Sequence, residues 1–365
     1  MSAELSQSPS TRGSGPVSAA DVDSAAKRVA AVVTPTPLQL SERLSATTGA
    51  TVYLKREDLQ IVRSYKLRGA YNLLVQLSPE ELAAGVVCSS AGNHAQGFAF
   101  ACRTLGVRGR VYVPAKTPKQ KRDRIRYHGG EFIELIVGGS TYDLAAEAAL
   151  ADVARTGATL VPPFDDPRTI AGQGTIAVEV LDQLDAEPDL VVVPVGGGGC
   201  IAGITTYLAE RTTNTSVLGV EPAGAAAMMA ALANGGPVSL DHVDQFVDGA
   251  AVNRAGRLTY AALAAAGDMV SITTVDEGAV CTAMLDLYQN EGIIAEPAGA
   301  LAVAGLLEAD VEPNSTVVCL VSGGNNDVSR YGEVLERSLV HLGLKHYFLV
   351  DFPQEPGALR RFLDG

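Results

Sequence analysis

The sequence has 365 residues, of which 47% are hydrophobic and 19% are charged, a composition typical of a globular protein with two or three compact units. Its formal net charge of −13 argues against nucleic acid or an anionic membrane as the partner, because both would repel an acidic surface. No uninterrupted apolar run reaches the ~18 residues of a membrane span.

The chain begins with a Ser-, Pro- and Gly-rich stretch that lacks the apolar centre of a signal peptide, so residues 1–19 are predicted to be a disordered tail. The cysteines are odd in number and show neither a CxxC motif nor Cys/His ligand spacing. This favours reduced core residues of a cytoplasmic protein and no metal site. They are Cys88, Cys102, Cys200, Cys281 and Cys319.

Short β-branched runs alternate with helical stretches along the chain. Several of the runs show no alternation of apolar and polar residues, which indicates parallel strands buried on both faces. The pattern predicts an α/β fold with open, mostly parallel sheets flanked by helices, and with ligands beyond the carboxyl ends of the strands. Strands are predicted at 51–54, 86–89, 111–114, 132–137, 159–162, 190–195, 216–220 and 315–322, and helices at 92–106, 119–129 and 140–157.

Changes in this pattern divide the chain into units. A small domain is predicted over residues 59–158, and a large domain over residues 20–58 and 159–344. The remaining residues 345–365 are predicted to form a strand, a Pro/Gly turn and the opening of a helix. Such a unit cannot bury its faces alone, so it is expected to be the incomplete start of a further domain.

The first candidate site residue is the lysine of "SYKLRGA" (64–70). Lys66 stands at a predicted helix start, and this stretch alone favours a solvated amine over a nucleophile. The second candidate is "CSSAGNHAQG" (88–97), where small residues at a strand–helix turn expose N–H groups suited to a carboxylate. The Asn93 amide there can bond a ring hydroxyl or carbonyl. His94 could be a base, although a histidine at a helix start is more often a structural donor.

The third candidate is "VVVPVGGGGCIAGI" (191–204), in which a buried strand passes through four glycines into an apolar helix. Without side chains, several backbone N–H groups can converge on one point near a helix N-terminus, which predicts a phosphate cradle. A tight turn is the plainer alternative. The fourth, "CLVSGGNND" (319–327), places Ser322 at a strand end, either as a hydrogen-bonding partner for a heterocycle nitrogen or as an ordinary turn serine. A phosphorylated aldehyde cofactor that forms a Schiff base with Lys66 would use all four stretches.

These stretches, with "EPAGA", occur in an order that resembles the fold-type II pyridoxal-phosphate enzymes, and specifically the threonine dehydratases (threonine ammonia-lyases), from about Ala20 to Leu344. The residues after Leu344 resemble the opening of the ACT-like regulatory domain of the biosynthetic, isoleucine-inhibited form. The resemblance implies a cofactor, pyridoxal 5′-phosphate, held between the two domains. It also implies a cytoplasmic homo-oligomer, a dimer or tetramer, that converts L-threonine by β-elimination of water to 2-oxobutanoate and ammonia. This is the first committed step of isoleucine biosynthesis.

Carried over residue by residue, the resemblance implies that Lys66 is the catalytic residue and holds the cofactor as a Schiff base. The phosphate would be bound by Gly196, Gly197, Gly198 and Gly199, the ring 3′-oxygen by Asn93 and the pyridine nitrogen by Ser322. Tyr65, where relatives often have phenylalanine, would pack beside the cofactor, and Glu296 would lie near it or satisfy N–H groups at a helix start. The substrate carboxylate would be held, chiefly through backbone N–H groups, by Ser89, Ser90, Ala91, Gly92 and His94.

One departure from the family pattern concerns a cation. Relatives similar to serine racemase bind a divalent ion through a glutamate and a following aspartate, but here Glu221 is followed by Ala227. A single carboxylate makes a weak divalent site, so a monovalent ion or none is expected.

Two other functions remain open at this stage: a serine dehydratase or racemase with the same chemistry, and a non-catalytic amino-acid sensor. A sensor has no need of a Schiff-base lysine. If the chain ends at Gly365, isoleucine is expected to inhibit weakly, because the effector domain would be incomplete.

Overall fold

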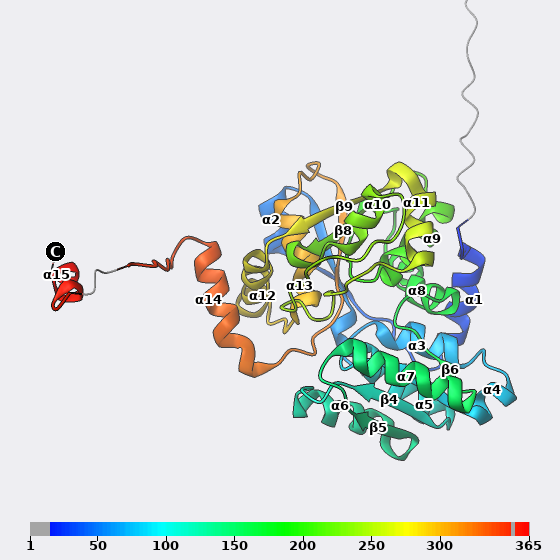
Figure 1. Cartoon of the computed structure of the whole chain (residues 1–365). Coiled ribbons are helices and arrows are strands. Elements are labelled where there is room, and N and C mark those ends of the chain that lie inside the picture. The colour runs from blue at the N-terminus through cyan, green and yellow to red at the C-terminus, as the bar shows by residue number, and fades with distance from the viewer. Residues whose placement is uncertain (1–14, 352–354, 365) are drawn as a thin grey trace, which may run out of the picture.

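The computed structural model describes residues 15–351 and 355–364. Up to α14 they form two units with mostly parallel sheets, stacked one above the other (Figure 1). The larger unit contains a six-stranded sheet in the order β1-β2-β10-β7-β8-β9. Only β1 is antiparallel to its neighbour. Its strands are β1 (Leu38–Leu40), β2 (Thr51–Arg56), β7 (Leu190–Pro194), β8 (Ser216–Pro222), β9 (Val270–Val275) and β10 (Thr316–Val321).

Helices cover both faces of this sheet, because successive residues of its central strands are apolar and point to opposite faces. Val192 and Cys319 pack into one core, whereas their neighbours Val193 and Val318 pack into the other. The first core is closed by α2, α12, α13 and α14, and the second by α1, α8, α9, α10 and α11. Their bounds are α1 (Ala19–Val29), α2 (Glu42–Thr48), α8 (Pro167–Gln183), α9 (Gly199–Arg211), α10 (Ala227–Ala233), α11 (Arg257–Ala266), α12 (Glu277–Glu291), α13 (Pro297–Glu308) and α14 (Tyr331–His341).

The smaller unit contains a four-stranded parallel sheet in the order β5-β4-β3-β6. Its strands are β3 (Val86–Ser89), β4 (Gly109–Val113), β5 (Ile133–Val137) and β6 (Thr159–Leu160). Helices α3, α5 and α6 pack against one face and α7 against the other. Since β6 pairs with β3, this sheet extends past the predicted domain limit at residue 158. The helices are α3 (Lys66–Leu74), α4 (Pro79–Ala84), α5 (Asn93–Leu105), α6 (Lys119–Gly129) and α7 (Tyr142–Thr156).

The eight strands and three helices predicted with residue ranges before Leu344 are confirmed to within about two residues at each end, whereas β1 and β9 were not predicted. The predicted tail is too long at its inner end. Val17 is buried, and the Ser18 hydroxyl accepts a hydrogen bond from the Asp21 N–H in a capping box that opens α1. Residues 1–14 of that prediction lie outside the described part of the chain.

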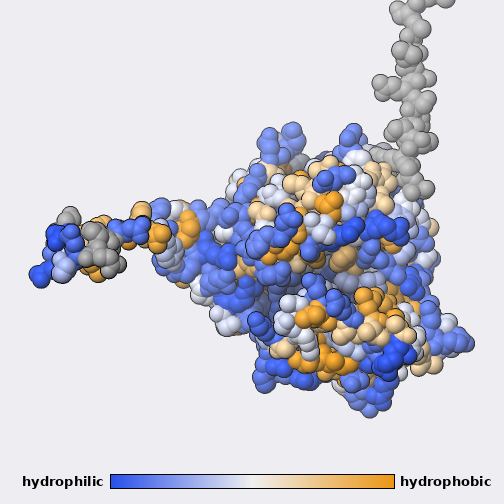
Figure 2. All heavy atoms as spheres, in the orientation of Figure 1, coloured by the Kyte–Doolittle hydropathy of each residue, from blue (hydrophilic) through white to orange (hydrophobic). Residues whose placement is uncertain are grey.

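At the other end, the strand predicted at the start of residues 345–365 is wrong: residues 345–350 form no strand, because among the described residues this segment has no neighbouring strand to pair with. The predicted helix start is confirmed as α15 (Ala358–Leu363). Phe348 and Leu349 lie 84% and 99% exposed on an arm that leaves the body of the molecule after α14, where Figure 2 shows hydrophobic and hydrophilic residues side by side.

All five cysteines are buried and free, as predicted. Among the helices of the described residues, none is both long and apolar enough to cross a membrane.

Helices α8 and α9 approach to backbone contact at two glycines. A Cβ added to Gly203 would lie 2.6 Å from the Gly174 N atom and would also clash with the Ile170 carbonyl oxygen. Neither obstacle is a flexible side chain, so the helices would have to move apart.

We therefore expect Gly203→Ala to lower the free energy of unfolding by about 1–3 kcal/mol, the usual cost of overpacking a core. Chemical denaturation of both proteins measures this difference. The matched control is Gly332→Ala, since Gly332 is exposed on α14 with open space around it. The control should be neutral or slightly stabilising, because alanine favours a helix. Equal losses in the two variants would contradict this account of the contact.

Candidate active site

Lys66 is the first residue of α3, at the junction between the two units. Its side chain is half-buried, and its Nζ donates a hydrogen bond to the Pro163 carbonyl oxygen at 3.0 Å. Burial lowers the pKa of Lys66 from 10.5 to about 8, although the charges of Cys200 and Glu296 oppose this shift. A useful fraction of the amine is therefore neutral, and hence nucleophilic, at neutral pH.

Tyr65 lies beside this amine, with its ring centre 5.2 Å from Lys66 Nζ. Its ring packs against the core of the larger unit, and burial raises the pKa of its hydroxyl well above the ordinary value. That hydroxyl has no hydrogen-bond partner among the residues that the structure describes. The ring therefore packs beside Lys66, and nothing among the described residues explains the hydroxyl.

The segment before Lys66 is attached to the end of β10. Tyr65 N donates to the Ser322 carbonyl oxygen at 3.2 Å, and Ser64 forms an isolated β-bridge with Gly323. Arg63 adopts a left-handed conformation (φ 56°), which costs a non-glycine residue on the order of 1 kcal/mol, and its carbonyl oxygen accepts from Gly324 N. These contacts bring Lys66 close to Ser322.

Ser322 is 3% exposed, and its Oγ donates to the Ala298 carbonyl oxygen at 3.2 Å. A hydroxyl can turn to donate elsewhere, because its hydrogen rotates about the C–O bond. The position suits a neutral donor to a ring nitrogen. An aspartate at the same place would keep such a nitrogen protonated.

The four glycines follow β7 and lead into α9. Within the described residues, no acceptor is found for the backbone N–H groups of Gly196, Gly197, Gly198 and Gly199, and the N-terminus of α9 adds partial positive charge. The other side of the loop is filled: a Cβ on Gly197 or Gly199 would collide with Phe164. Gly198 has φ of 90°, which only glycine adopts readily. The loop is a row of free donors backed by protein, which fits a phosphate group.

A second row of donors follows β3. In the part of the chain that the structure describes, the N–H groups of Ser90, Ala91, Asn93 and His94 have no acceptor, and Gly92 N has only the Ser90 hydroxyl at 3.3 Å. Ser89 Oγ is buried and likewise without a partner there. Free donors at the N-terminus of α5 suit a carboxylate.

The His94 side chain has a structural contact. It is 3% exposed, and its Nε2 lies 2.8 Å from the Val161 carbonyl oxygen. Burial, aided by the charge of Lys66, lowers the pKa of His94 to about 3. A neutral ring must donate from Nε2 to that carbonyl, so the side chain holds the 161–166 loop. The backbone N–H of His94 stays free to face a ligand.

Asn93 is held by two side chains from the larger unit. Its Nδ2 donates to Glu296 Oε1, and its Oδ1 accepts from Asn325 Nδ2 at 2.8 Å. These contacts fix which end of the amide is the donor. One N–H of Nδ2 remains for a phenolic oxygen, the role that the family resemblance implies for Asn93.

Glu296 precedes α13, but its carboxylate makes no capping hydrogen bond to that helix. This contradicts the helix-start alternative and leaves Glu296 as the partner of Asn93. Burial raises the pKa of Glu296 to about 7, and the charge of Asp248 acts in the same direction. Glu221, by contrast, satisfies the start of α10 by accepting from Met228 N and Met229 N at 2.7 and 2.8 Å. Among the described residues no cluster of metal-ligating side chains is found.

The predicted site residues thus form one connected set, but three residues that join them were not predicted. The Pro163 carbonyl oxygen accepts a hydrogen bond from Lys66, Phe164 packs against the glycine loop, and Asn325 orients Asn93. Asn325 lies within the stretch "SGGNND", so its amide beside Ser322 was a usable signal. The stretch "PPF" (162–164) carries no chemical signal, because the roles of Pro163 and Phe164 come only from the place of this loop in the fold.

Together these residues fit pyridoxal phosphate, with a neutral amine for its aldehyde, free N–H donors for its phosphate and a hydroxyl and an amide for its ring. Comparisons with known proteins indicate the same cofactor. A model of the pyridoxal-phosphate-dependent enzyme family matches residues 29–323, and a model of the C-terminal regulatory domain of threonine dehydratase matches residues 336–365. The second match begins within α14, earlier than the predicted start at residue 345.

Two similar curated proteins carry the same name. The chain is 90% identical to the biosynthetic L-threonine dehydratase IlvA of Mycobacterium bovis, covering 100% of this chain and 85% of the relative. The Corynebacterium glutamicum protein of the same name is 59% identical, over 98% of this chain and 83% of the relative. Among solved structures, threonine deaminase isoform 2 of Solanum lycopersicum superimposes with a TM-score of 0.82 at 40% identity. That likeness covers 87% of this chain and 92% of the tomato chain.

The lowered pKa of Lys66 gives a testable pH dependence. Only the neutral amine attacks an aldehyde, so the rate at which cofactor-free protein captures pyridoxal phosphate should rise with pH through a midpoint near 8. An ordinary lysine would give a midpoint above 10. The rate is followed by visible absorbance, and borohydride reduction with peptide mapping identifies the lysine. A midpoint above 10, or a label elsewhere, would contradict the assignment.

Proposed function

The chain belongs to the family of pyridoxal-phosphate-dependent enzymes, and we propose from this premise that it is a threonine ammonia-lyase. It would convert L-threonine by β-elimination of water to 2-oxobutanoate and ammonia, at the start of isoleucine biosynthesis. The observation that carries the proposal is the half-buried Lys66, whose amine has a lowered pKa. Its charge acts on Cys200 and His94, which lie at the starts of the two helices that follow the rows of free N–H donors. The names of the similar proteins support the substrate.

Bound pyridoxal phosphate supplies an electron sink conjugated to the substrate nitrogen, which weakens the Cα–H bond and allows the β-hydroxyl to leave. The protein supplies the positions and the proton transfers. We assign the cofactor phosphate to the N–H groups of Gly196–Gly199 and the substrate carboxylate to those of Ser90–His94. The neutral amine of Lys66 would take the Cα proton at Nζ, since a lysine of pKa about 8 is an effective base near neutral pH.

Ser322 and Asn93 would act on the ring. The Ser322 hydroxyl can donate a hydrogen bond to the ring nitrogen without protonating it, so electrons are withdrawn less strongly than with an acid at this place. A weaker sink favours prompt loss of the β-hydroxyl over return of the proton to Cα. This suits elimination better than racemisation.

We further propose that the enzyme works in the cytoplasm as a homo-oligomer, a dimer or tetramer, and that its activity is allosterically regulated. The free cysteines support a reducing compartment, and the match over residues 336–365 supports regulation. The oligomer follows from the family resemblance. Light scattering of the purified protein tests it, and a monomeric mass would overturn it.

The first functional prediction concerns Lys66. Lys66→Ala should lower 2-oxobutanoate formation from L-threonine by about 10³-fold or more, because both the cofactor attachment and the base are lost. Lys116→Ala is the matched control, since Lys116 is exposed and its side chain makes no hydrogen bond or ion pair within the described residues, and it should keep full activity. Full activity of Lys66→Ala would contradict the proposed mechanism. A wild-type protein without activity would favour the amino-acid sensor.

The second concerns the substrate. We expect kcat/KM for keto-acid formation to be highest with L-threonine, lower with L-serine and negligible with the D-forms. A coupled assay with lactate dehydrogenase or direct absorbance of the keto acid measures all four. A preference for serine, or interconversion of L- and D-serine seen by chiral chromatography, would favour the serine dehydratase or racemase alternative.

A further inference from the structure

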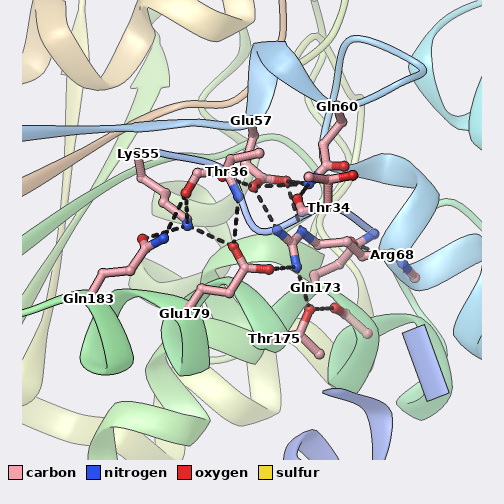
Figure 3. A network of polar contacts seen from close by, with 12 residues as sticks. Thr34, Thr36, Lys55, Glu57, Gln60, Arg68, Gln173, Thr175, Glu179 and Gln183 are labelled. Carbon is pink, nitrogen blue, oxygen red and sulfur yellow. Dashed lines mark hydrogen bonds and ion pairs between the residues drawn. The ribbon is translucent and has the colours of Figure 1, made fainter. Parts of the chain in front are cut away.

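A buried ring of charged and polar side chains lies where β2, α3 and α8 meet (Figure 3). Two of its members flank the segment that carries Lys66. Glu57 lies in the short 3-10 helix η1 (Glu57–Leu59) that follows β2, and Arg68 lies in the first turn of α3. Residues 58–67 therefore run from one to the other.

The contact between these two side chains is bidentate. Arg68 Nε donates to Glu57 Oε2 at 2.8 Å, and Arg68 Nη2 donates to Glu57 Oε1 at 2.7 Å. Both side chains are fully buried. A bidentate pair fixes direction as well as distance, so the two ends of the segment are fastened in one relative orientation.

The rest of the ring holds this pair against α8. Arg68 Nη1 lies 2.7 Å from Glu179 Oε1 and donates to Thr175 Oγ1 at 3.0 Å. Lys55 Nζ donates to Glu179 Oε2 at 2.7 Å and to the Thr36 carbonyl oxygen at 2.8 Å, while Thr36 Oγ1 donates to Glu57 Oε1 at 2.7 Å. Two cations thus face two anions in a closed set.

The start of α3 is also pressed against α8 at the backbone. Gly69 N donates to Gln173 Oε1 at 3.2 Å, and a Cβ on Gly172 would lie 2.6 Å from Gly69 Cα. On another side, a Cβ on Gly97 of α5 would lie 2.9 Å from Leu67 N. The helix start has little room to shift while the ring is intact.

Buried ion pairs are a costly way to stabilise a fold, because apolar side chains of similar volume often do as well or better. What a closed ring of this kind supplies is a defined geometry. Within residues 58–67, Ser64 and Tyr65 contact the end of β10, and Lys66 follows directly after them. The ends of the segment therefore decide where the amine stands relative to Ser322 and to the Pro163 carbonyl oxygen.

We propose that Glu57 and Arg68 are positioning residues for Lys66, acting as a clamp that sets the place of its amine in the active site. Because both side chains are fully buried, the clamp would act through the chain that it holds and not by contact with substrate or cofactor. The consequence for turnover rests on the function proposed above, but the reactivity of Lys66 toward an aldehyde does not.

The test compares two double variants that each remove one cation and one anion from the same ring. Glu57→Gln/Arg68→Met opens the clamp and leaves the Lys55–Glu179 pair, whereas Lys55→Met/Glu179→Gln leaves the bidentate clamp. Each cofactor-free protein is mixed with pyridoxal phosphate, and the rate and pH midpoint of capture by Lys66 are followed by absorbance. Thermal unfolding of the same samples measures the structural loss.

We expect the clamp variant to capture the cofactor about tenfold or more slowly, with its pH midpoint raised toward that of an ordinary lysine, because a misplaced amine is both slower and more hydrated. In turnover its kcat should fall while KM stays within about threefold. The control should unfold at a similarly reduced temperature but keep a capture rate within about twofold. Similar capture defects in both variants, or in neither, would overturn the proposal.

Milder variants decide the matter if the double variants do not fold. Glu57→Gln and Glu179→Gln each remove one negative charge from the ring without changing side-chain shape. Of these two, only Glu57→Gln should slow capture of pyridoxal phosphate and raise the pH midpoint of capture. Arg68→Lys, which keeps the charge but loses the bidentate contact, should also slow capture. Equal effects of the two glutamine variants would overturn the clamp. A wild type that captures no pyridoxal phosphate would instead refute the proposed function.

Discussion

The active site depends on an amine that is half-buried against a neutral oxygen. Lys66 Nζ donates to a backbone carbonyl, and within the described residues no carboxylate forms an ion pair with it. A carboxylate at that distance would stabilise the charged form and hold the pKa high. Because the partner is the Pro163 carbonyl, burial dominates and the pKa falls to about 8. The charges of Cys200 and Glu296 act in the opposite direction, but neither group forms an ion pair with the amine within the described residues.

The order of strands explains how the parts of the site meet. β2, β10 and β7 are parallel neighbours, so their carboxyl ends lie side by side at one edge of the larger sheet. The Lys66 segment follows β2, Ser322 follows β10 and the glycine loop follows β7. In the smaller sheet the turn that carries Asn93 follows β3, and the Pro163 loop follows the neighbouring β6. The contacts of Asn93 with Glu296 and of Lys66 with Pro163 then join this edge of the smaller sheet to the corresponding edge of the larger sheet.

The strongest sequence signals came from residues whose chemistry is local. Four glycines after a strand, or a serine at a strand end, indicate a ligand wherever the strand lies. Phe164 and the ring around Arg68 could not be predicted in this way, because their roles exist only when α8 and the loop before it are placed against α3. The strand predicted over 345–350 failed for the same reason. A β-branched and aromatic run becomes a strand only beside a partner, and the described chain offers none there.

Glu296 shows how the same burial acts on acid and base together. Burial raises the pKa of its carboxyl to about 7 and lowers that of Lys66 to about 8, so both groups titrate close to neutral pH. When Glu296 is protonated, it adds no negative charge to stabilise the ammonium form of Lys66. When Glu296 is ionised, its charge raises the pKa of Lys66. The hydrogen bond from Asn93 favours the ionised form of Glu296 and so opposes the neutral amine, whereas desolvation favours both neutral forms. Partial exclusion of water from the site therefore keeps Lys66 reactive. The fixed position of α3 keeps the amine in this poorly hydrated site.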